Sequence, residues 1–182
     1  MKIFVGSSSE QLPVIKEIVR DLKDIIDKYN IHIESWKEWF AHGQFNGWST
    51  WKIIQEALKE FDIAIMLLAT DDVVQSRNKE LKMTRDNVLL EAGAFAQKCG
   101  IENVILLIPC DVDYKLPSDF LGLNCIVFDY ARGADNSEAY KKICEKVLSY
   151  YEAGLKGDKI LENNIKIKET NEKIRKVKGK LR

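Results

Sequence analysis

The sequence of 182 residues is 46% hydrophobic and 31% charged, which suits one globular domain with an appendage. Its 28 basic and 28 acidic residues are unevenly spread, because positions 154–182 carry a net charge of +6 and positions 1–153 a net charge of −6. The acidic charge of positions 1–153 argues against nucleic-acid binding by that part of the chain, and the change of charge predicts a domain boundary at 153/154. No apolar run approaches the roughly 18 residues that a membrane span needs.

The body alternates apolar runs with segments of helical periodicity. The predicted strands are 2–6, 31–36, 62–70, 103–109 and 124–130. Helices are predicted between them and after the last strand, including one that Ser8 or Ser9 caps and others at 49–60, 84–100 and 135–152. We expect an aromatic-rich loop at 37–48 and a polar loop at 71–84. This order predicts an α/β fold with an open, doubly wound parallel sheet of five strands.

The segment 154–182 differs from the body in pattern as well as in charge. Apolar residues recur every seven positions, at Ile160, Ile167, Ile174 and Leu181. One apolar position per heptad is thin for a coiled coil. We interpret the segment as a basic amphipathic helical tail or linker exposed to solvent, and keep a weak self-association helix or a connection to a further part as alternatives.

Polar and aromatic residues follow several predicted strands. In a doubly wound sheet, ligands bind outside the carboxyl ends of the strands. These ends are marked by the Gly-Ser-Ser-Ser turn at 6–9, by Trp36, by 70–72 and by 109–111. The helix that follows the third strand opens on the same side, so we expect a cleft there.

Glu91 is the only ionisable residue from Asn87 through Gln97. A carboxylate among apolar side chains is costly unless it is paired or used. Glu91 shares a helix face with Asn87, lies near Arg85, and feels the positive end of the helix dipole, which favours its ionised form. We predict either a catalytic carboxylate at the cleft or a structural one that caps a backbone amide or pairs with Arg85.

The residues at two other strand ends offer polar groups to a ligand. Gly6, Ser7 and Ser8 present backbone amides and hydroxyls to a phosphate or ribose, although they match no Walker or dinucleotide motif. The alternative is that they only cap the next helix. Asp71 and Asp72 offer carboxylates to ribose hydroxyls or, alternatively, cap a turn.

Aromatic side chains crowd the segment after the second strand. Trp36 and Trp39 are the predicted stacking surfaces for a base or a nicotinamide ring, and we expect at least half of the aromatic residues there to be core or interface residues instead. No group with metal-ligand spacing is visible. His32 and His42 lack a Cys or His companion, so we expect no metal, a structural His32 and a surface His42.

The four cysteines are scattered without a C-x-x-C pair, and none has a histidine nearby in sequence. A thiol nucleophile is therefore unsupported. No signal peptide precedes the first predicted strand. These observations together predict a cytoplasmic protein.

Four stretches resemble those of one family, in the same order: IFVGSSSE (3–10), FDIAIMLLATDD (61–72), RDNVLLEAGAF (85–95) and LPSDFLGL (116–123). They resemble the predicted nucleotide-binding TIR-like (Toll/interleukin-1 receptor-like) domains of bacterial antiphage effectors. The stretch R-D-N-V-L-L-E-A-G is the most specific, because it fixes Arg, Asn, Glu and Gly at set spacing in one helix. The resemblance covers residues 3–130 and leaves the tail out.

The resemblance implies an enzyme that cleaves NAD at the nicotinamide–ribose bond, with NAD as substrate and no cofactor. Carried over, the catalytic glutamate falls on Glu91, whose carboxylate would face the ribose and stabilise an oxocarbenium-like charge. The other implied roles are ribose or phosphate contacts by 6–9, a place near the diphosphate for Arg85, pocket lining by Asp71 or Asp72, and an aromatic residue over the base.

TIR-like enzymes generally work as assemblies, so the resemblance also implies a homo-oligomer held by TIR–TIR contacts. The loop at 37–48 would reach a neighbouring protomer and help to complete its site. Such domains are often fused to, or controlled by, a cyclic-nucleotide sensor, which is the other expected partner. Three alternatives stay open at this point: a nucleoside deoxyribosyltransferase-like enzyme with a nucleophilic glutamate, a non-catalytic TIR adaptor, and a nucleotide sensor without turnover.

Overall fold

The structure is a computed structural model that describes residues 1–26, 29–76, 79–110, 114, 116–120, 123–131 and 133–154. The chain divides into two compact units, Met1–Glu145 and Lys146–Arg182. The first unit carries the sheet and the helices packed on it. The predicted boundary at 153/154 stays a prediction, because the tail from residue 155 onward lies outside the described residues.

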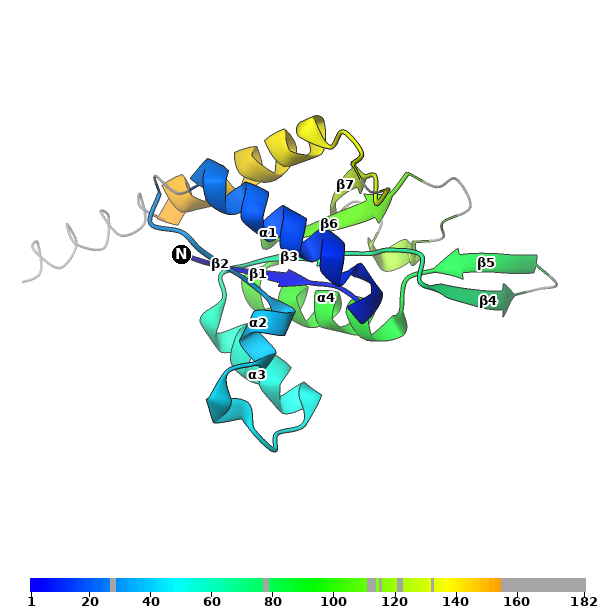
Figure 1. Cartoon of the computed structure of the whole chain (residues 1–182), viewed down its shortest axis with the longest axis horizontal. Helices are drawn as coiled ribbons and strands as arrows, with labels where there is room; N and C mark the ends of the chain where they lie inside the picture. The colour runs from blue at the N-terminus through cyan, green and yellow to red at the C-terminus, as the bar shows by residue number, and fades with distance from the viewer. Residues whose placement is uncertain are drawn as a thin grey trace, which may run out of the picture. The chain divides into compact units, whose positions relative to one another are not determined.

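A parallel sheet of five strands forms the centre of the first unit, as predicted (Figure 1). Its strands are β1 (Lys2–Gly6), β2 (His32–Ser35), β3 (Ile63–Leu67), β6 (Val104–Pro109) and β7 (Asn124–Phe128). They lie in the order β2-β1-β3-β6-β7, and every pairing is parallel. The order reverses direction at β1, so the carboxyl ends of β1 and β3 flank the switch point where such sheets bind ligands.

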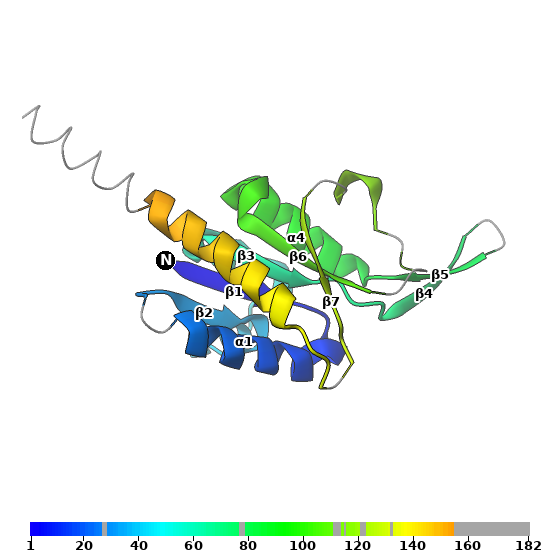
Figure 2. The same cartoon turned by 90° about the horizontal axis from the view of Figure 1, so that it is seen from above.

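Helices cover both faces of the sheet (Figures 1 and 2). On one face lies α1 (Leu12–Ile26), whose buried stripe recurs at helical spacing. On the other face lie α3 (Thr50–Glu60) and α4 (Asp86–Cys99). A last helix occupies 137–154. Within the described ranges, no helix is long and apolar enough to cross a bilayer.

An aromatic cluster joins α4 to the first strand. Phe4 of β1 stacks on Phe95 of α4, with ring centroids 4.8 Å apart and an interplanar angle of 25°. Phe61 meets Phe4 edge-on at 5.3 Å. Phe4 and Phe95 are both fully buried, and such aromatic pairs contribute beyond their buried area. This packing fixes the distance between the end of β1 and the first turns of α4.

The predicted polar loop at 71–84 was wrong. The structure contains an antiparallel hairpin there, made of β4 (Asp72–Ser76) and β5 (Lys79–Met83). The hairpin forms a two-stranded sheet of its own and extends beyond the five-stranded sheet (Figures 1 and 2). Val74 lies opposite Leu81, but the pairs on either side of them each include a polar residue, Lys82 on one side and Gln75 with Glu80 on the other. The apolar alternation that predicts strands is therefore too short to recognise in the sequence.

Two connections also differ from the prediction. The aromatic segment begins with a short helix, α2 (Trp36–Phe40), because Ser35 and Glu38 form a capping box at its start. Between β6 and β7, where alternation predicted a helix, the described residues contain only a single helical turn at Ser118–Phe120. At the first helix, Ser8 precedes the helical turn Ser9–Gln11 without capping it through its side chain.

Candidate active site

A cavity of about 170 Å³ lies where the loop after β1, the helix α2 and the first turns of α4 meet. Six predicted site residues line it: Ser7, Ser8, Trp36, Arg85, Asn87 and Glu91. Sequence reasoning missed Thr50 and Val88, whereas the remaining two lining residues belong to predicted segments, Ser9 to the serine turn at 6–9 and Phe40 to the aromatic-rich loop at 37–48. The cavity therefore occupies the place that the strand order predicts for a ligand.

Glu91 lies in the second turn of α4 and reaches the cavity half-buried. Among the described residues, its carboxyl group has no hydrogen-bond or ion-pair partner. Burial raises the pKa of Glu91 from the ordinary 4.5 to about 7. This effect of burial is opposite in direction to the predicted effect of the helix dipole, which favours the ionised form. A carboxyl group with a pKa near neutrality and no partner among the described residues is free to contact a ligand in the cavity, which is typical of functional sites.

Arg85 occupies the N-cap position of α4, and its side chain pairs with Glu10 and Asp72. Its Nη1 donates to both carboxylate oxygens of Glu10, at 2.9 and 3.0 Å, and its Nη2 donates to Asp72 at 3.2 Å. The predicted alternative in which Arg85 pairs with Glu91 is therefore wrong. Two carboxylates neutralise the guanidinium, so Arg85 joins the loop after β1 to the hairpin and to α4.

Asp71 and Asp72 support the cavity from outside its lining. Asp71 accepts hydrogen bonds from the hydroxyl of Ser8 at 2.5 Å and from the side-chain amide of Gln11 at 2.9 Å. Asp72 holds Arg85. The prediction that Asp71 or Asp72 lines the pocket is therefore corrected. Asp71 instead positions Ser8 of the loop after β1, and Asp72 positions Arg85 at the start of α4.

Gly6 also lies outside the lining and is buried at the end of β1. A Cβ atom at this position would lie 2.6 Å from Cε of Met66 and 3.1 Å from Cε1 of Phe4. Such distances are well inside van der Waals contact. A glycine therefore lets β1 pass close to the packed side chain of Met66 just before the serine loop turns into the cavity.

The two tryptophans have different places. Trp36 lines the cavity and meets Phe40 edge-on, with ring centroids 5.6 Å apart. Within the described residues, its buried Nε1 has no hydrogen-bond partner. Trp39 lies in the core instead, where its Nε1 donates to the carbonyl of Ile53 at 3.3 Å. The prediction that Trp39 offers a stacking surface is therefore corrected, because Trp39 does not line this cavity. Trp36 lines it, so its stacking role stays a prediction.

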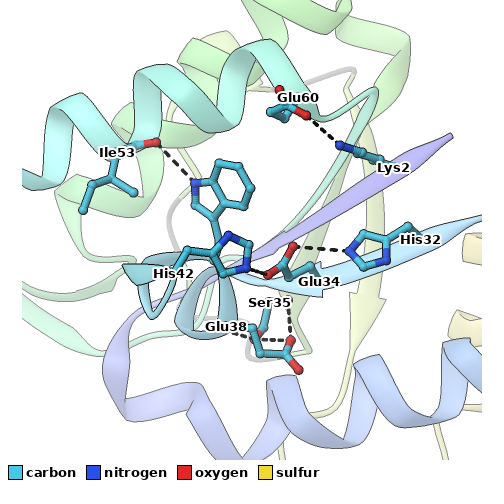
Figure 3. A network of polar contacts seen from close by, with 9 residues as sticks. Lys2, His32, Glu34, Ser35, Glu38, His42, Ile53 and Glu60 are labelled. Atoms are coloured by element: carbon cyan, nitrogen blue, oxygen red, sulfur yellow. Dashed lines mark hydrogen bonds and ion pairs between the residues drawn. The ribbon is translucent and has the colours of Figure 1, made fainter. Parts of the chain in front are cut away.

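A polar network behind the aromatic segment was not anticipated (Figure 3). Glu34 of β2 is buried, and its two carboxylate oxygens lie 2.8 Å from Nε2 of His42 and 3.3 Å from Nε2 of His32. His42 is thus tied to the edge strand, although it is exposed. The sequence did contain a signal for part of this network, because the H-x-E spacing at 32–34 places His32 and Glu34 on one side of a strand.

Over the described ranges, no three or more His, Cys, Asp or Glu residues are grouped to hold a metal ion.

The raised pKa of Glu91 gives a prediction for stability. The folded protein retains a proton on Glu91 between pH 4.5 and about 7, whereas the unfolded chain has lost it. The stability from this proton is complete below pH 4.5 and disappears as the pH rises to about 7. We therefore expect the free energy of unfolding of the wild type, relative to Glu91→Gln, to fall by up to about 1.4 kcal/mol per pH unit in this interval. Urea denaturation at several pH values measures the difference, and a difference independent of pH would contradict the desolvated state of Glu91.

The fold and the cavity together define a doubly wound α/β domain with a carboxyl group in the cleft after β1. The chain belongs to the family described as CAP12/Pycsar effector protein, TIR domain, whose model matches residues 2–130. The match covers β1 through the end of β7 and includes every residue of the cavity. The predicted relation to bacterial TIR-like effector domains is therefore confirmed.

Relatives of this chain carry names from the same family. The Pycsar effector protein XpPycTIR of Xanthomonas perforans is 32% identical over 152 residues, which cover 81% of this chain and 46% of the relative. A CD-NTase-associated protein 12 of Niabella drilacis is 36% identical over 140 residues, 70% of this chain and 39% of the relative. The chain thus spans less than half the length of these relatives. Among solved structures, the CMP N-glycosidase BcmB of Clostridium botulinum aligns with a TM-score of 0.45 and 15% identity, over 79% of this chain and 98% of that one.

Proposed function

We propose that this domain is an NAD nucleosidase, which cleaves the bond between nicotinamide and ribose as a TIR effector of bacterial antiphage defence. The observation that carries the proposal is Glu91, a half-buried carboxyl group with a raised pKa in the cavity of a domain that matches this family. A cytoplasmic location accompanies this proposal.

The reaction needs a carboxylate more than it needs an acid. Nicotinamide is attached to ribose through a positively charged ring nitrogen, so it leaves as a neutral molecule when the C1′–N bond breaks. The positive charge then moves to the ribose, as in other glycoside cleavages. The ionised carboxylate of Glu91 stabilises that charge, and water adds at C1′ with release of one proton to give ADP-ribose.

The charge balance around the cavity supports the orientation of the substrate. Glu10 and Asp72 pair with Arg85, Asp71 holds Ser8, and Glu91 adds a further acidic group. An acidic surrounding favours the cationic nicotinamide riboside end of NAD over its diphosphate. In this proposal Arg85 organises the loop after β1, rather than serving as a free ligand for the diphosphate, and Trp36 provides the flat surface for a ring.

The size of the cavity supports an assembly. A volume of about 170 Å³ lies below the roughly 300–1,000 Å³ of ligand pockets, so most of an NAD molecule would extend outside it. We propose that the segment 37–48 of a second protomer completes the site. The name CD-NTase-associated, carried by relatives about twice as long, supports a cyclic-nucleotide sensor as a further domain or partner.

Nicotinamide release tests the proposal directly. We expect the full chain, incubated with NAD, to release nicotinamide at a rate per chain that rises with protein concentration, because the assembled site is the active one. Chromatography of the products measures this. Exchange of bases between deoxynucleosides, without any nicotinamide release, would favour the deoxyribosyltransferase alternative. Activity per chain that is constant over concentration would contradict the need for assembly.

A further inference from the structure

The β4–β5 hairpin is an extension that the cavity does not explain. It is a two-stranded sheet with the register Asp72 opposite Met83 and Val74 opposite Leu81. The hairpin extends away from the five-stranded sheet in both views (Figures 1 and 2). A two-stranded hairpin alone is marginally stable in water, so a partner along one of its edges would add stability.

The outer edge of β4 is open. Within the described residues, β4 pairs only with β5, whereas the other side of β5 is bridged at Lys82 to Tyr114. The side chain of Val73 is 59% exposed and that of Val74 is 41% exposed. Open edges are usually protected by charged residues, proline or a bulge. The centre of β4 has none of these, since it reads Val73-Val74-Gln75, while the charges of the hairpin lie mainly on β5.

We propose that β4 pairs with β4 of a second copy of this chain, antiparallel and about a twofold axis at Val74. This register places Val74 opposite Val74 of the second copy and Val73 opposite Gln75. It aligns one apolar row across four strands: Leu81, Val74, and the same two residues of the second copy. The register keeps Asp72 from lying opposite Asp72 of the second copy.

The contact would also act on the site. Asp72, the first residue of β4, holds the guanidinium of Arg85, which lines the cavity. Pairing of β4 fixes the strand from which this carboxylate extends. The contact is separate from the one proposed for the segment 37–48, and it does not depend on what the cavity binds.

Disulfide cross-linking tests the register in the full chain. In a Cys110→Ser background, which removes the exposed native thiol, Val74→Cys places two thiols opposite each other across the twofold axis. We expect a covalent dimer under mild oxidation, formed at least about tenfold faster than in the matched control Ile101→Cys, because directly opposed Cβ atoms lie about 4.5–5.5 Å apart. Ile101 is 54% exposed and lies outside the hairpin. Equal rates for the two variants would overturn the proposal.

Sedimentation over a range of protein concentrations gives a second, non-covalent measurement. Val74→Glu places two like charges in contact and removes two methyl-bearing side chains from the apolar row. We expect at least about a tenfold increase in the dimer dissociation constant, whereas Ile101→Glu should leave it unchanged. Circular dichroism checks that both variants fold. Association that Val74→Glu does not weaken would overturn the proposal, whether or not NAD is cleaved.

Discussion

Glu91→Gln is expected to lower the rate of nicotinamide release from NAD at least about a hundredfold at pH 7.5. The substitution keeps the size and polarity of the side chain and removes only its negative charge. That charge stabilises the ribose cation in the transition state, where loss of one preorganised electrostatic partner typically costs about 10²–10³ in kcat. Initial rates at saturating NAD and equal high protein concentration measure the change.

A matched substitution separates chemistry from general effects of charge. Glu138→Gln makes the same chemical change at an exposed site whose only described contact is a 3.7 Å ion pair with Lys142, and its rate should equal that of the wild type. Glu91→Gln should also be no less stable than the wild type at this pH, because it removes a desolvated carboxylate. Equal release by Glu91→Gln and the wild type would remove Glu91 from the catalytic role.

The five strands of the parallel sheet and the place of Glu91 at the cavity were predictable because their signals are local. Buried parallel strands are continuous apolar runs, and those at 2–6 and 103–109 were placed within a residue of β1 and β6. Glu91 stood out because charge is absent on either side of it for several residues. A pattern that can be read within one window of sequence needs no knowledge of tertiary contacts.

The contacts around Glu91 were not predictable, because they join distant segments. Glu10 and Arg85 are 75 positions apart, and nothing near either residue indicates the other. Burial of Glu91 comes from the packing of α4 against the loop after β1, so the direction of its pKa shift required the fold. Trp36 and Trp39 lie three positions apart on α2 and therefore share a helix face, so the local pattern does not indicate which of the two rings lies in the core.

Phe95→Ala is expected to lower the free energy of unfolding by about 3–5 kcal/mol, the usual cost of truncating a buried phenylalanine. Phe95 lies one turn after Glu91 on α4, is fully buried, and stacks on Phe4 two residues before Gly6. The substitution leaves a cavity at the contact between the helix that carries Glu91 and the strand that leads into the serine loop. Urea denaturation at pH 7.5 measures the change.

Two variants on the same helix act as controls. Leu90 is 59% exposed, so Leu90→Ala should change stability by less than about 0.5 kcal/mol. Phe95→Leu keeps much of the volume and should lie between the two. Below its unfolding midpoint, Phe95→Ala should still release nicotinamide more slowly than Leu90→Ala, because a loosened contact with Phe4 lets Glu91 shift relative to Ser7 and Ser8. A cost below about 1 kcal/mol for Phe95→Ala would show that this aromatic contact does not hold α4 in place.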